Sequence, residues 1–273
     1  MSSEMASTDR DALLALFRST RGSGWKNSNN WNTDAPLSDW YGVQVDGEGR
    51  VVELLLPDNN LRGAMPKELG RLVTLRILYL DGNGLTGSIA EELGGLPNLE
   101  EMLLNDNKLI GVIPTELGRL VKLRILYLDG NSLTGSIPKE LGGLLNLEDL
   151  QLQRNELSGG IPTELGRLVT LRILYLSGNG LEGSIPEELG GLVNLEDLRL
   201  SDIKLTGVIP PDLGRLVKLR ILYLDGNGLT GSIAEELGGL LNLEELLLND
   251  NKLTGVIPKE LGRLVELRIL YLD

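Results

Sequence analysis

The sequence predicts an α/β solenoid: a right-handed horseshoe with a parallel concave β-sheet, short helical turns on its convex side and a helical N-terminal cap. Two observations predict it. From Val51 onward the sequence returns on itself every 24 residues, and each return joins a short apolar-polar alternation to a Glu-Leu-Gly segment. The first 50 residues lack this repeat, but they hold all three tryptophans and the only phenylalanine.

The repeat sets the domain organisation. A leucine opens each unit at positions 75, 99, 123, 147, 171, 195, 219, 243 and 267, which gives nine full units over 51–266 and a truncated tenth. Repeat proteins grow along one dimension, because each unit packs only on its neighbours. We therefore expect an N-terminal capping module at 1–50 and one repeat array at 51–273.

The alternation within a unit predicts a short strand. Leu78 and Leu80 alternate with Ile77, Tyr79 and Asp81, which is the two-residue period of a strand with one buried face. The leucines are expected to point into the solenoid and the other three side chains outward. A Glu-Leu-Gly-x-Leu segment then predicts a short helical turn on the opposite side.

An asparagine stands at the ninth position of eight of the nine units, for example Asn83, and Ile203 replaces it in the other. A buried amide at a turn can satisfy backbone groups that no strand pairing reaches. Asn is therefore expected to be structural, and Ile203 to leave one backbone group without its usual partner.

The N-terminal segment predicts a cap. A helix is expected from about Thr8 to Ser19, with Thr8 as its N-cap and Asp11 reaching back. Its apolar side chains, including Leu13 and Phe17, would cover the open end of the stack.

The pattern L-x-x-L-x-L-x-x-N-x-L at constant period is the signature of the leucine-rich repeat. The segment L-T-G-x-I-P-x-E-L-G-x-L resembles the plant-type repeat, which has an extra short strand at Leu-Thr-Gly-x-Ile. The segments DRDALLALFRSTRGSGW and DWYGVQVDGEGRVVELLL resemble the plant N-terminal capping module, with Ser38 and Val45 in place of its two cysteines.

The cysteine-free cap, with DRDALLAL, WNTDA, GVQV and GRVVEL, most resembles the leucine-rich-repeat region of brown-algal LRR-ROCO proteins. In those proteins the array precedes a Ras-like GTPase module. The resemblance implies the ligand-sensing part of an intracellular ROCO-type receptor with a role in innate immunity. A GTPase phosphate loop, G-x-x-x-x-G-K-[ST], does not occur in this sequence.

Composition limits the function. The formal net charge is −13, from 26 basic and 39 acidic residues, which disfavours nucleic acid and anionic membranes as partners. Cysteine and histidine are absent, which excludes thiolate zinc sites, a cysteine nucleophile and an imidazole base. We expect no enzyme, no cofactor and no metal. The sequence shows neither a signal peptide nor a long apolar run, so a cytoplasmic location is expected.

Outward positions carry the candidate site. Arg and Glu alternate at the second position of successive units, which predicts a structural ladder of ion pairs. Thirteen acids stand at outward positions three, five, seven and eight against only Arg154 and Arg199, which favours a basic or mixed-charge partner. Tyrosine recurs at the fifth position of every second unit, and it suits either a binding face or packing between strands.

Outward residues change most in the middle of the array. The predicted binding residues are Asp149, Gln151, Gln153, Arg154, Tyr175, Ser177, Asp197, Arg199, Ser201, Asp202 and Tyr223. Arg199 is expected to lie over the rings of Tyr175 and Tyr223, because strands lie about 4.8 Å apart. The function predicted is protein or peptide recognition.

Two further expectations stay open. The near-identity of the units also fits a structural or engineered consensus scaffold without a specific ligand. In addition, the last strand, Leu270-Tyr271-Leu272-Asp273, has no polar capping unit behind it, so self-association through this end is expected.

Overall fold

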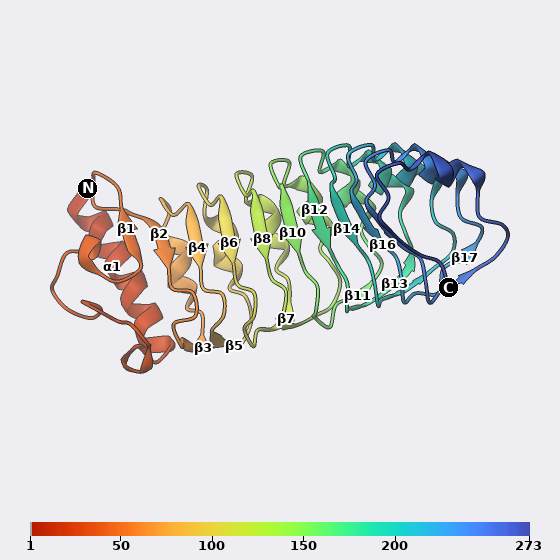
Figure 1. Cartoon of the computed structure of the whole chain (residues 1–273). Coiled ribbons are helices and arrows are strands. Elements are labelled where there is room, and N and C mark those ends of the chain that lie inside the picture. The colour runs from red at the N-terminus through yellow and green to blue at the C-terminus, as the bar shows by residue number, and fades with distance from the viewer. Residues whose placement is uncertain (1) are drawn as a thin grey trace. The chain divides into compact units, whose positions relative to one another are not determined.

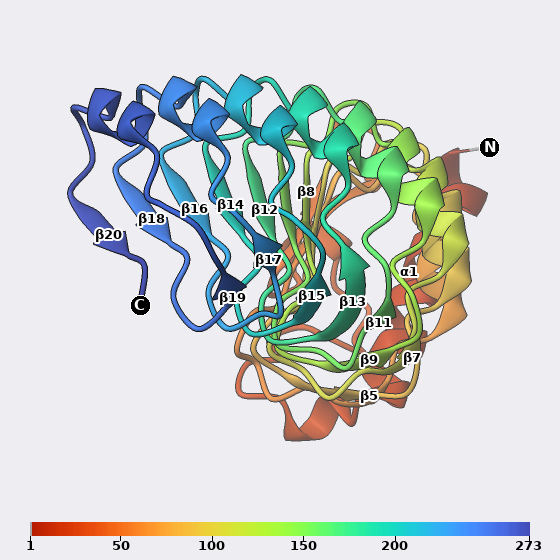
Figure 2. The same ribbon diagram turned by 90° about the vertical axis from the view of Figure 1, so that its right-hand side faces the viewer.

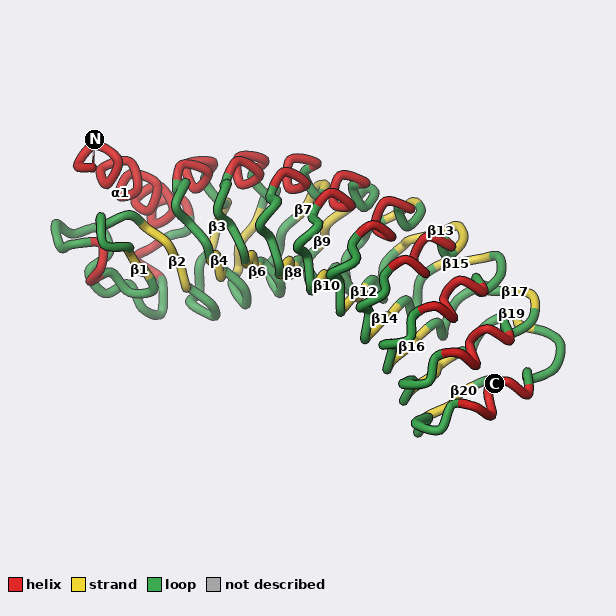
Figure 3. The backbone as a smooth tube through the Cα atoms, turned by 90° about the horizontal axis from the view of Figure 1, so that it is seen from above, coloured by secondary structure: helices red, strands yellow, loops and turns green. Residues whose placement is uncertain are grey.

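The computed structural model describes residues 2–273, with side chains from Thr8 onward. The chain divides between Leu133 and Thr134 into two compact units, which are described in turn. In both, a short strand, a loop and a short 3-10 helix follow one another in each repeat, as the yellow, green and red segments of Figure 3 show. The predicted α/β solenoid with a parallel sheet and short helical turns is confirmed. No helix in the described part of the chain is long and apolar enough to cross a membrane.

Helix α1 (Ser2–Ser19) opens the first unit. It begins at Ser2, earlier than expected, so Thr8 lies inside the helix and the predicted N-cap at that residue is wrong. The prediction that this helix covers the open end of the repeat stack is confirmed, because Leu13 and Leu16 are fully buried and α1 packs against η3 (Lys67–Arg71). Two further 3-10 turns follow α1, η1 (Gly22–Gly24) and η2 (Leu37–Asp39).

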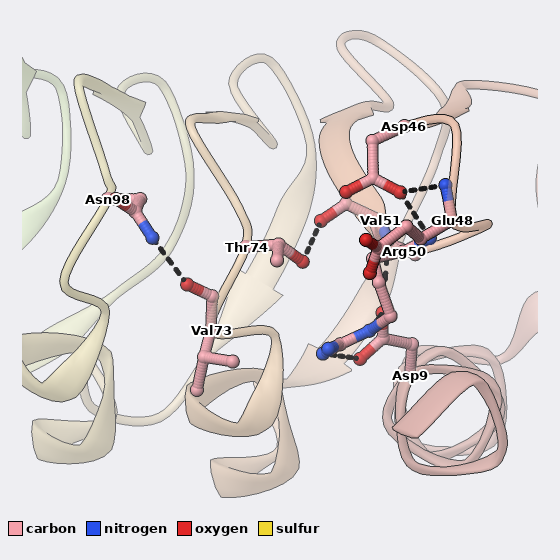
Figure 4. Close-up of polar contacts among 8 residues, drawn as sticks. All are labelled: Asp9, Asp46, Glu48, Arg50, Val51, Val73, Thr74 and Asn98. Carbon is pink, nitrogen blue, oxygen red and sulfur yellow. Dashed lines mark hydrogen bonds and ion pairs between the residues drawn. The ribbon is translucent and has the colours of Figure 1, made fainter. Parts of the chain in front are cut away.

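A buried ion pair joins α1 to the first repeat. Both oxygens of Asp9 accept hydrogen bonds from Arg50, at 2.8 Å from Nε and 2.9 Å from Nη2 (Figure 4). The backbone N–H of Val51 donates to the same carboxylate at 3.0 Å. Both side chains are almost completely buried, so the pair fixes where the cap meets the array. No sequence pattern indicated this pair, since its partners lie far apart in the chain.

Aromatic side chains fill the rest of the cap. Phe17 and Trp25 meet edge to face with their ring centroids 5.3 Å apart, and Trp25 and Trp31 at 4.8 Å. Trp31 and Trp40 lie 4.9 Å apart. Such contacts stabilise a cluster beyond simple burial of area. The tryptophans therefore supply the apolar core of the N-terminal segment.

The main strands of the first unit lie side by side (Figure 1). They are β1 (Val43–Val45), β2 (Val51–Leu55), β4 (Ile77–Tyr79), β6 (Glu101–Leu103) and β8 (Ile125–Tyr127). Strand β1 runs antiparallel to β2, and the later pairs are parallel. The antiparallel β1 belongs to the cap and was not expected.

The main strands of the second unit run parallel to one another, and Figure 2 shows those from β12 to β20 side by side. They are β10 (Asp149–Gln151), β12 (Ile173–Tyr175), β14 (Asp197–Arg199), β16 (Ile221–Tyr223), β18 (Glu245–Leu247) and β20 (Ile269–Tyr271). Residues 24 apart pair in register, so equal repeat positions form straight rows across the sheet.

A second set of short strands forms the extra ladders expected of the plant-type repeat. They are β3 (Arg62–Ala64), β5 (Gly84–Thr86), β7 (Ile110–Val112), β9 (Ser132–Thr134), β11 (Ser158–Gly159), β13 (Gly180–Ser184), β15 (Lys204–Thr206), β17 (Thr230–Gly231) and β19 (Lys252–Leu253). The glycine of each Leu-Thr-Gly turn has a positive φ, as at Gly207 with 77°, where a side chain would be strained.

Each remaining repeat closes with a five-residue 3-10 helix. These helices are η4 (Glu91–Gly95), η5 (Thr115–Arg119), η6 (Lys139–Gly143), η7 (Thr163–Arg167), η8 (Glu187–Gly191), η9 (Pro211–Arg215), η10 (Glu235–Gly239) and η11 (Lys259–Arg263). The glycine after the buried leucine lets neighbouring helices approach closely. A Cβ at Gly190 would lie 2.5 Å from the carbonyl oxygen of Asp212.

The ninth-position asparagines bind backbone groups, as predicted. In the second unit, Asn179 donates to the carbonyl oxygens of Leu152 and Leu176, at 3.0 and 2.9 Å, and accepts from the amide of Leu157 at 3.0 Å. Two repeats later, Asn227 accepts from Leu205 in the same way. These bonds satisfy buried backbone groups that the main strands do not reach.

Ile203 interrupts this row. By the spacing of the neighbouring repeats, residue 203 faces the amide of Leu181, where an asparagine oxygen would otherwise accept. The isoleucine side chain is 4% exposed and offers only apolar surface there.

Candidate functional site

The fifth-position row of the second unit places an arginine between two tyrosines. Arg199 on β14 pairs in register with Tyr175 on β12 and with Tyr223 on β16. Its guanidinium carbon lies 4.6 Å from the centre of the Tyr175 ring and 4.9 Å from that of Tyr223. Both distances are within the range of cation–π attraction. The expected stacking of Arg199 on these two rings is confirmed.

Asp197 holds this arginine from the same strand. Arg199 donates from Nε and Nη2 to the two carboxylate oxygens of Asp197, at 3.0 and 2.9 Å. The Tyr175 hydroxyl donates to Asp197 Oδ2 at 2.6 Å. Asp197 is 9% exposed and satisfied by these three bonds. It positions Arg199 and offers little surface to a partner.

These contacts fix the charge states of the cluster. The hydrogen bonds to Asp197 raise the pKa of Arg199 above its usual value. Burial, followed by the hydrogen bond to Asp197, raises the pKa of Tyr175, and burial with the bond to Glu245 raises that of Tyr223 to about 12. At neutral pH the cluster therefore presents a permanent cation between two protonated phenols.

Arg199 retains donors for a ligand. A guanidinium has five N–H donors, and Asp197 takes two of them, which leaves three. The side chain of Arg199 is 34% exposed, so its free edge reaches solvent while its two faces are covered. A rigid donor of this kind costs little side-chain entropy when it binds.

The seventh- and eighth-position residues form a polar border beside the cluster. The Ser201 hydroxyl donates to Asp225 Oδ1 at 2.6 Å, and the Ser201 amide donates to the Ser177 hydroxyl at 3.0 Å. Asp202 is exposed and has a φ of 52°. Asp225 was not among the predicted residues, although it completes this border.

The predicted glutamines lie on the adjoining strand. Gln151 on β10 pairs in register with Tyr175 and donates to Asp149 Oδ1 at 3.2 Å. Gln153 donates to the Gln151 side-chain oxygen at 3.2 Å, while its own buried Oε1 has no partner among the described residues. The glutamines therefore extend the cluster by one strand and keep one acceptor unused.

Arg154 lies at a different repeat position from Arg199. It has a φ of 56° at the eighth position, where every second repeat has glycine, as at Gly178. Its backbone amide donates to the carbonyl of Ser177 at 2.9 Å. The two arginines thus lie on different repeats and at different positions, and the structure does not bring them to one point.

Two isoleucines complete the site and were missed from the sequence. Ile173 and Ile221 occupy the third position on either side of Asp197 and are partly exposed. They place apolar surface next to the ion pair, beside the two tyrosine rings. Because isoleucine recurs regularly at every second repeat, the sequence did not distinguish these two from ordinary strand residues.

The fifth-position tyrosines also have a structural role. Tyr79 and Tyr223 each donate a hydroxyl hydrogen bond to the third-position glutamate of the following repeat, Glu101 and Glu245. Tyr175 makes the same bond to Asp197. The interpretation as packing between strands is therefore confirmed, because the hydroxyls join repeats and two of the rings flank Arg199. The interpretation as a binding face stays a prediction.

The predicted ion-pair ladder runs across the sheet at the residues that directly precede the main strands. Arg172 bonds to Glu196 at 2.8 Å and Arg220 to Glu244 at 2.6 Å, and the arginines of both pairs are more than half exposed. Exposed pairs of this kind contribute about 0.2–1 kcal/mol each. In the described residues no group of three or more acidic side chains is placed to hold a metal ion.

Comparison with known families identifies the repeat. One family model described as leucine rich repeat matches residues 74–133 and 122–181, and a second matches 194–216, 218–240 and 242–264. Among curated proteins, an inactive leucine-rich repeat receptor-like serine/threonine-protein kinase of Arabidopsis thaliana is 41% identical over 36% of this chain and 14% of its own length. A receptor protein kinase of Oryza sativa is 36% identical over 31% of this chain and 9% of its own length.

Solved structures agree with this assignment. The ectodomain of the Arabidopsis thaliana receptor kinase GASSHO1/SCHENGEN3 is 36% identical with a TM-score of 0.83, over 95% of this chain and 34% of that one. A plant peptide hormone receptor in complex with RGF2 is 39% identical with a TM-score of 0.78, over 79% and 35%. A plant ice-binding protein is 29% identical with a TM-score of 0.76, over 98% and 95%.

The chain is therefore a plant-type leucine-rich-repeat protein, and it resembles the leucine-rich-repeat ectodomains of plant receptor kinases. It spans about a third of the two receptor chains and a much smaller share of the two curated kinases. These relatives give no support to the expected resemblance to ROCO proteins.

Proposed function

We propose that the chain recognises a peptide or an extended protein segment through the sheet face around Arg199. The observation that carries this proposal is the clamped arginine: Asp197 and two tyrosine rings fix Arg199, yet three of its donors remain for a ligand. A rigid arginine among aromatic rings is the composition found where binding energy concentrates at protein interfaces.

The structural neighbours support the same class of ligand. The receptor in complex with RGF2 is a peptide hormone receptor, and the HAESA structure contains the peptide hormone IDA with a co-receptor. GASSHO1/SCHENGEN3 was solved with CASPARIAN STRIP INTEGRITY FACTOR 2. This chain covers only part of each of them, so a peptide ligand for it stands as a proposal.

The charge of the face favours a basic or mixed-charge ligand. Asp202, Asp225 and Asp149 surround the cluster, while the charge of Arg199 is balanced by Asp197. A cationic ligand is drawn to such a face, whereas an acidic one meets repulsion around it. Ligand carbonyl groups would accept from Arg199, and apolar side chains would cover Ile173 and Ile221.

Selection from a displayed random-peptide library tests the proposal. The immobilised chain should enrich peptides that carry lysine or arginine beside apolar residues, and these should fail to bind the Arg199→Glu variant. Peptides that bind both forms equally would move the site away from this face. Failure to enrich any peptide would favour the structural-scaffold alternative.

The intracellular ROCO-type role remains a prediction. The cysteine-free cap favours it, and the matched receptor kinases favour a different domain context. The parent reading frame decides between them: a downstream GTPase module supports the prediction, and a membrane-spanning segment followed by a kinase domain opposes it. The cytoplasmic location and self-association through Tyr271 and its neighbours also remain predictions.

Ice binding is a second candidate function. The ice-binding neighbour matches over nearly the full length of both chains. In the second unit, Thr206, Thr230 and Thr254 repeat at one exposed position, and each hydroxyl contacts the carbonyl of a glycine in the preceding repeat. Ice is a periodic solid, so a surface that binds it needs groups at a constant spacing. The row of three threonines supplies such a spacing. Thermal hysteresis of the purified chain, compared with a Thr230→Lys variant, tests this candidate.

A further inference from the structure

The second unit exposes a row of aliphatic side chains where the chain enters each main strand. This lateral stripe occupies the twenty-third repeat position and comprises Leu145, Val169, Val193, Val217, Leu241 and Val265. Each is exposed by about half or more, for example Val193 by 49% and Val217 by 54%. Scattered surface valines need no explanation, but a continuous apolar row marks an interaction surface.

The backbone under the stripe is held in place from repeat to repeat. Asn194 donates to the carbonyl of Val169 at 2.7 Å, and Asn242 to that of Val217 at 2.6 Å. The same bond joins Asn98 to Val73 in the first unit (Figure 4). The stripe is therefore a regular row. The main strands that follow its six residues lie about 4.8 Å apart, so their five intervals span about 24 Å.

The ion-pair ladder lies three residues along the chain from the stripe. In the second unit it reads Glu148, Arg172, Glu196, Arg220, Glu244 and Arg268. Three acids and three bases balance, so the ladder itself is neutral although the whole chain has a formal charge of −13. Like-charge repulsion therefore opposes association through the acidic sheet face and does not oppose it through the ladder.

An alternating row with an even number of charges is complementary to itself when reversed. A two-fold axis between Glu196 and Arg220 places Glu196 opposite Arg220 of a second copy, Arg172 opposite Glu244, and Glu148 opposite Arg268. The stripe reverses onto itself about the same axis, with Val193 opposite Val217. A two-fold interface requires this kind of self-complementary patch.

From the stripe and the ladder together we infer that this part of the second unit binds a second copy of the chain in an antiparallel, two-fold arrangement. The apolar stripe supplies the buried centre and the ladder supplies the register. The residues of the stripe and the ladder are not among those proposed to bind the peptide.

Sedimentation velocity over a range of concentrations tests the dimer. The wild-type chain should show a concentration-dependent monomer–dimer equilibrium. The double variant Val193→Glu, Val217→Glu should weaken it at least tenfold, with an unchanged thermal unfolding midpoint. The matched control is Val208→Glu, because Val208 is also 54% exposed in the second unit but lies after β15, at a different repeat position.

Exchanging the charges of two ladder residues tests how the two copies are aligned in the dimer. Glu196→Arg alone should weaken the dimer, because the introduced guanidinium would face Arg220 of the second copy, and adding Arg220→Glu should restore it. A chain that stays monomeric at all concentrations would overturn the inference. So would a dimer that the double valine variant leaves intact, or one that is lost only when Leu270 and Tyr271 are replaced, since that result assigns association to the last strand.

Discussion

Asp197 and Arg199, two residues apart on β14, bond to each other at two points, and the Tyr175 hydroxyl closes the arrangement from the neighbouring strand. Because the main strands align residues 24 apart, this side-chain pair lies between rings that the repeat itself supplies. A single changed repeat thus produces a local cluster of side chains within a sheet whose strands stay in register.

The Asp197→Asn variant tests whether Asp197 holds Arg199 in the position that binds a peptide. The amide keeps the size of the side chain but replaces one acceptor oxygen with a donor, so Arg199 loses its two-point contact. We expect a loss of stability of about 1–3 kcal/mol, from a partly buried charge without its partner. Binding of selected peptides should weaken at the same time. Unfolding in urea gives the first value, and unchanged stability would mean that Arg199 is held by the tyrosine rings alone.

Ile203→Asn should stabilise the array by about 1 kcal/mol, because the new amide oxygen can accept from Leu181 as Asn179 and Asn227 accept from their partners. The gain is offset in part by the loss of buried aliphatic surface. The thermal unfolding midpoint should rise. A lower midpoint would show that the turn has rearranged around isoleucine and no longer leaves room for the amide.

Asp9→Ala should be among the most damaging single changes in the cap. It leaves Arg50 buried without a partner and removes the acceptor of the Val51 amide. Breaking a buried pair from one side costs about 3–5 kcal/mol. Glu196→Ala, which removes an exposed ladder partner of Arg172, should cost no more than about 1 kcal/mol. Equal losses for the two variants would contradict the assigned role of the buried pair.

Asp81→Asn should stabilise the protein in a pH-dependent manner. Burial, with added repulsion from Asp58 and Asp106, raises the pKa of Asp81 above its ordinary value of 3.8. A carboxyl group with a raised folded-state pKa contributes stability below that ordinary value and loses it as the pH rises through the folded-state pKa. The variant should therefore gain at neutral pH, by up to about 0.5 kcal/mol for a half-exposed group, and gain nothing below pH 3.8. A gain that is constant with pH would contradict this cause.

The repeat explains how much of the fold could be predicted. Leucine and asparagine positions follow from packing and backbone satisfaction in every unit, so one unit predicts all the others. The stacking of Arg199 followed from its position between Tyr175 and Tyr223 and a constant strand spacing. These are consequences of periodicity, and periodicity is visible in the sequence.

The contacts that could not be predicted are those that do not follow from the 24-residue repeat. Asp9 and Arg50 meet across 41 residues outside the repeat. The start of α1 at Ser2 and the antiparallel β1 depend on how the cap packs. Within the array, the position of Asp197 predicted a surface acid, but its bonds to Arg199 and Tyr175 make it buried and structural.

The proposal that the Arg199 face binds a ligand is tested most directly by comparing one arginine of the site with one of the ladder. Isothermal titration of a selected peptide should show that Arg199→Glu costs about 2 kcal/mol or more of binding free energy, as expected when a central interface residue is reversed. Arg124→Glu, in the structural ladder at the second repeat position, should change it by less than about 1 kcal/mol. Equal affinities for the wild type and Arg199→Glu would place the binding site elsewhere.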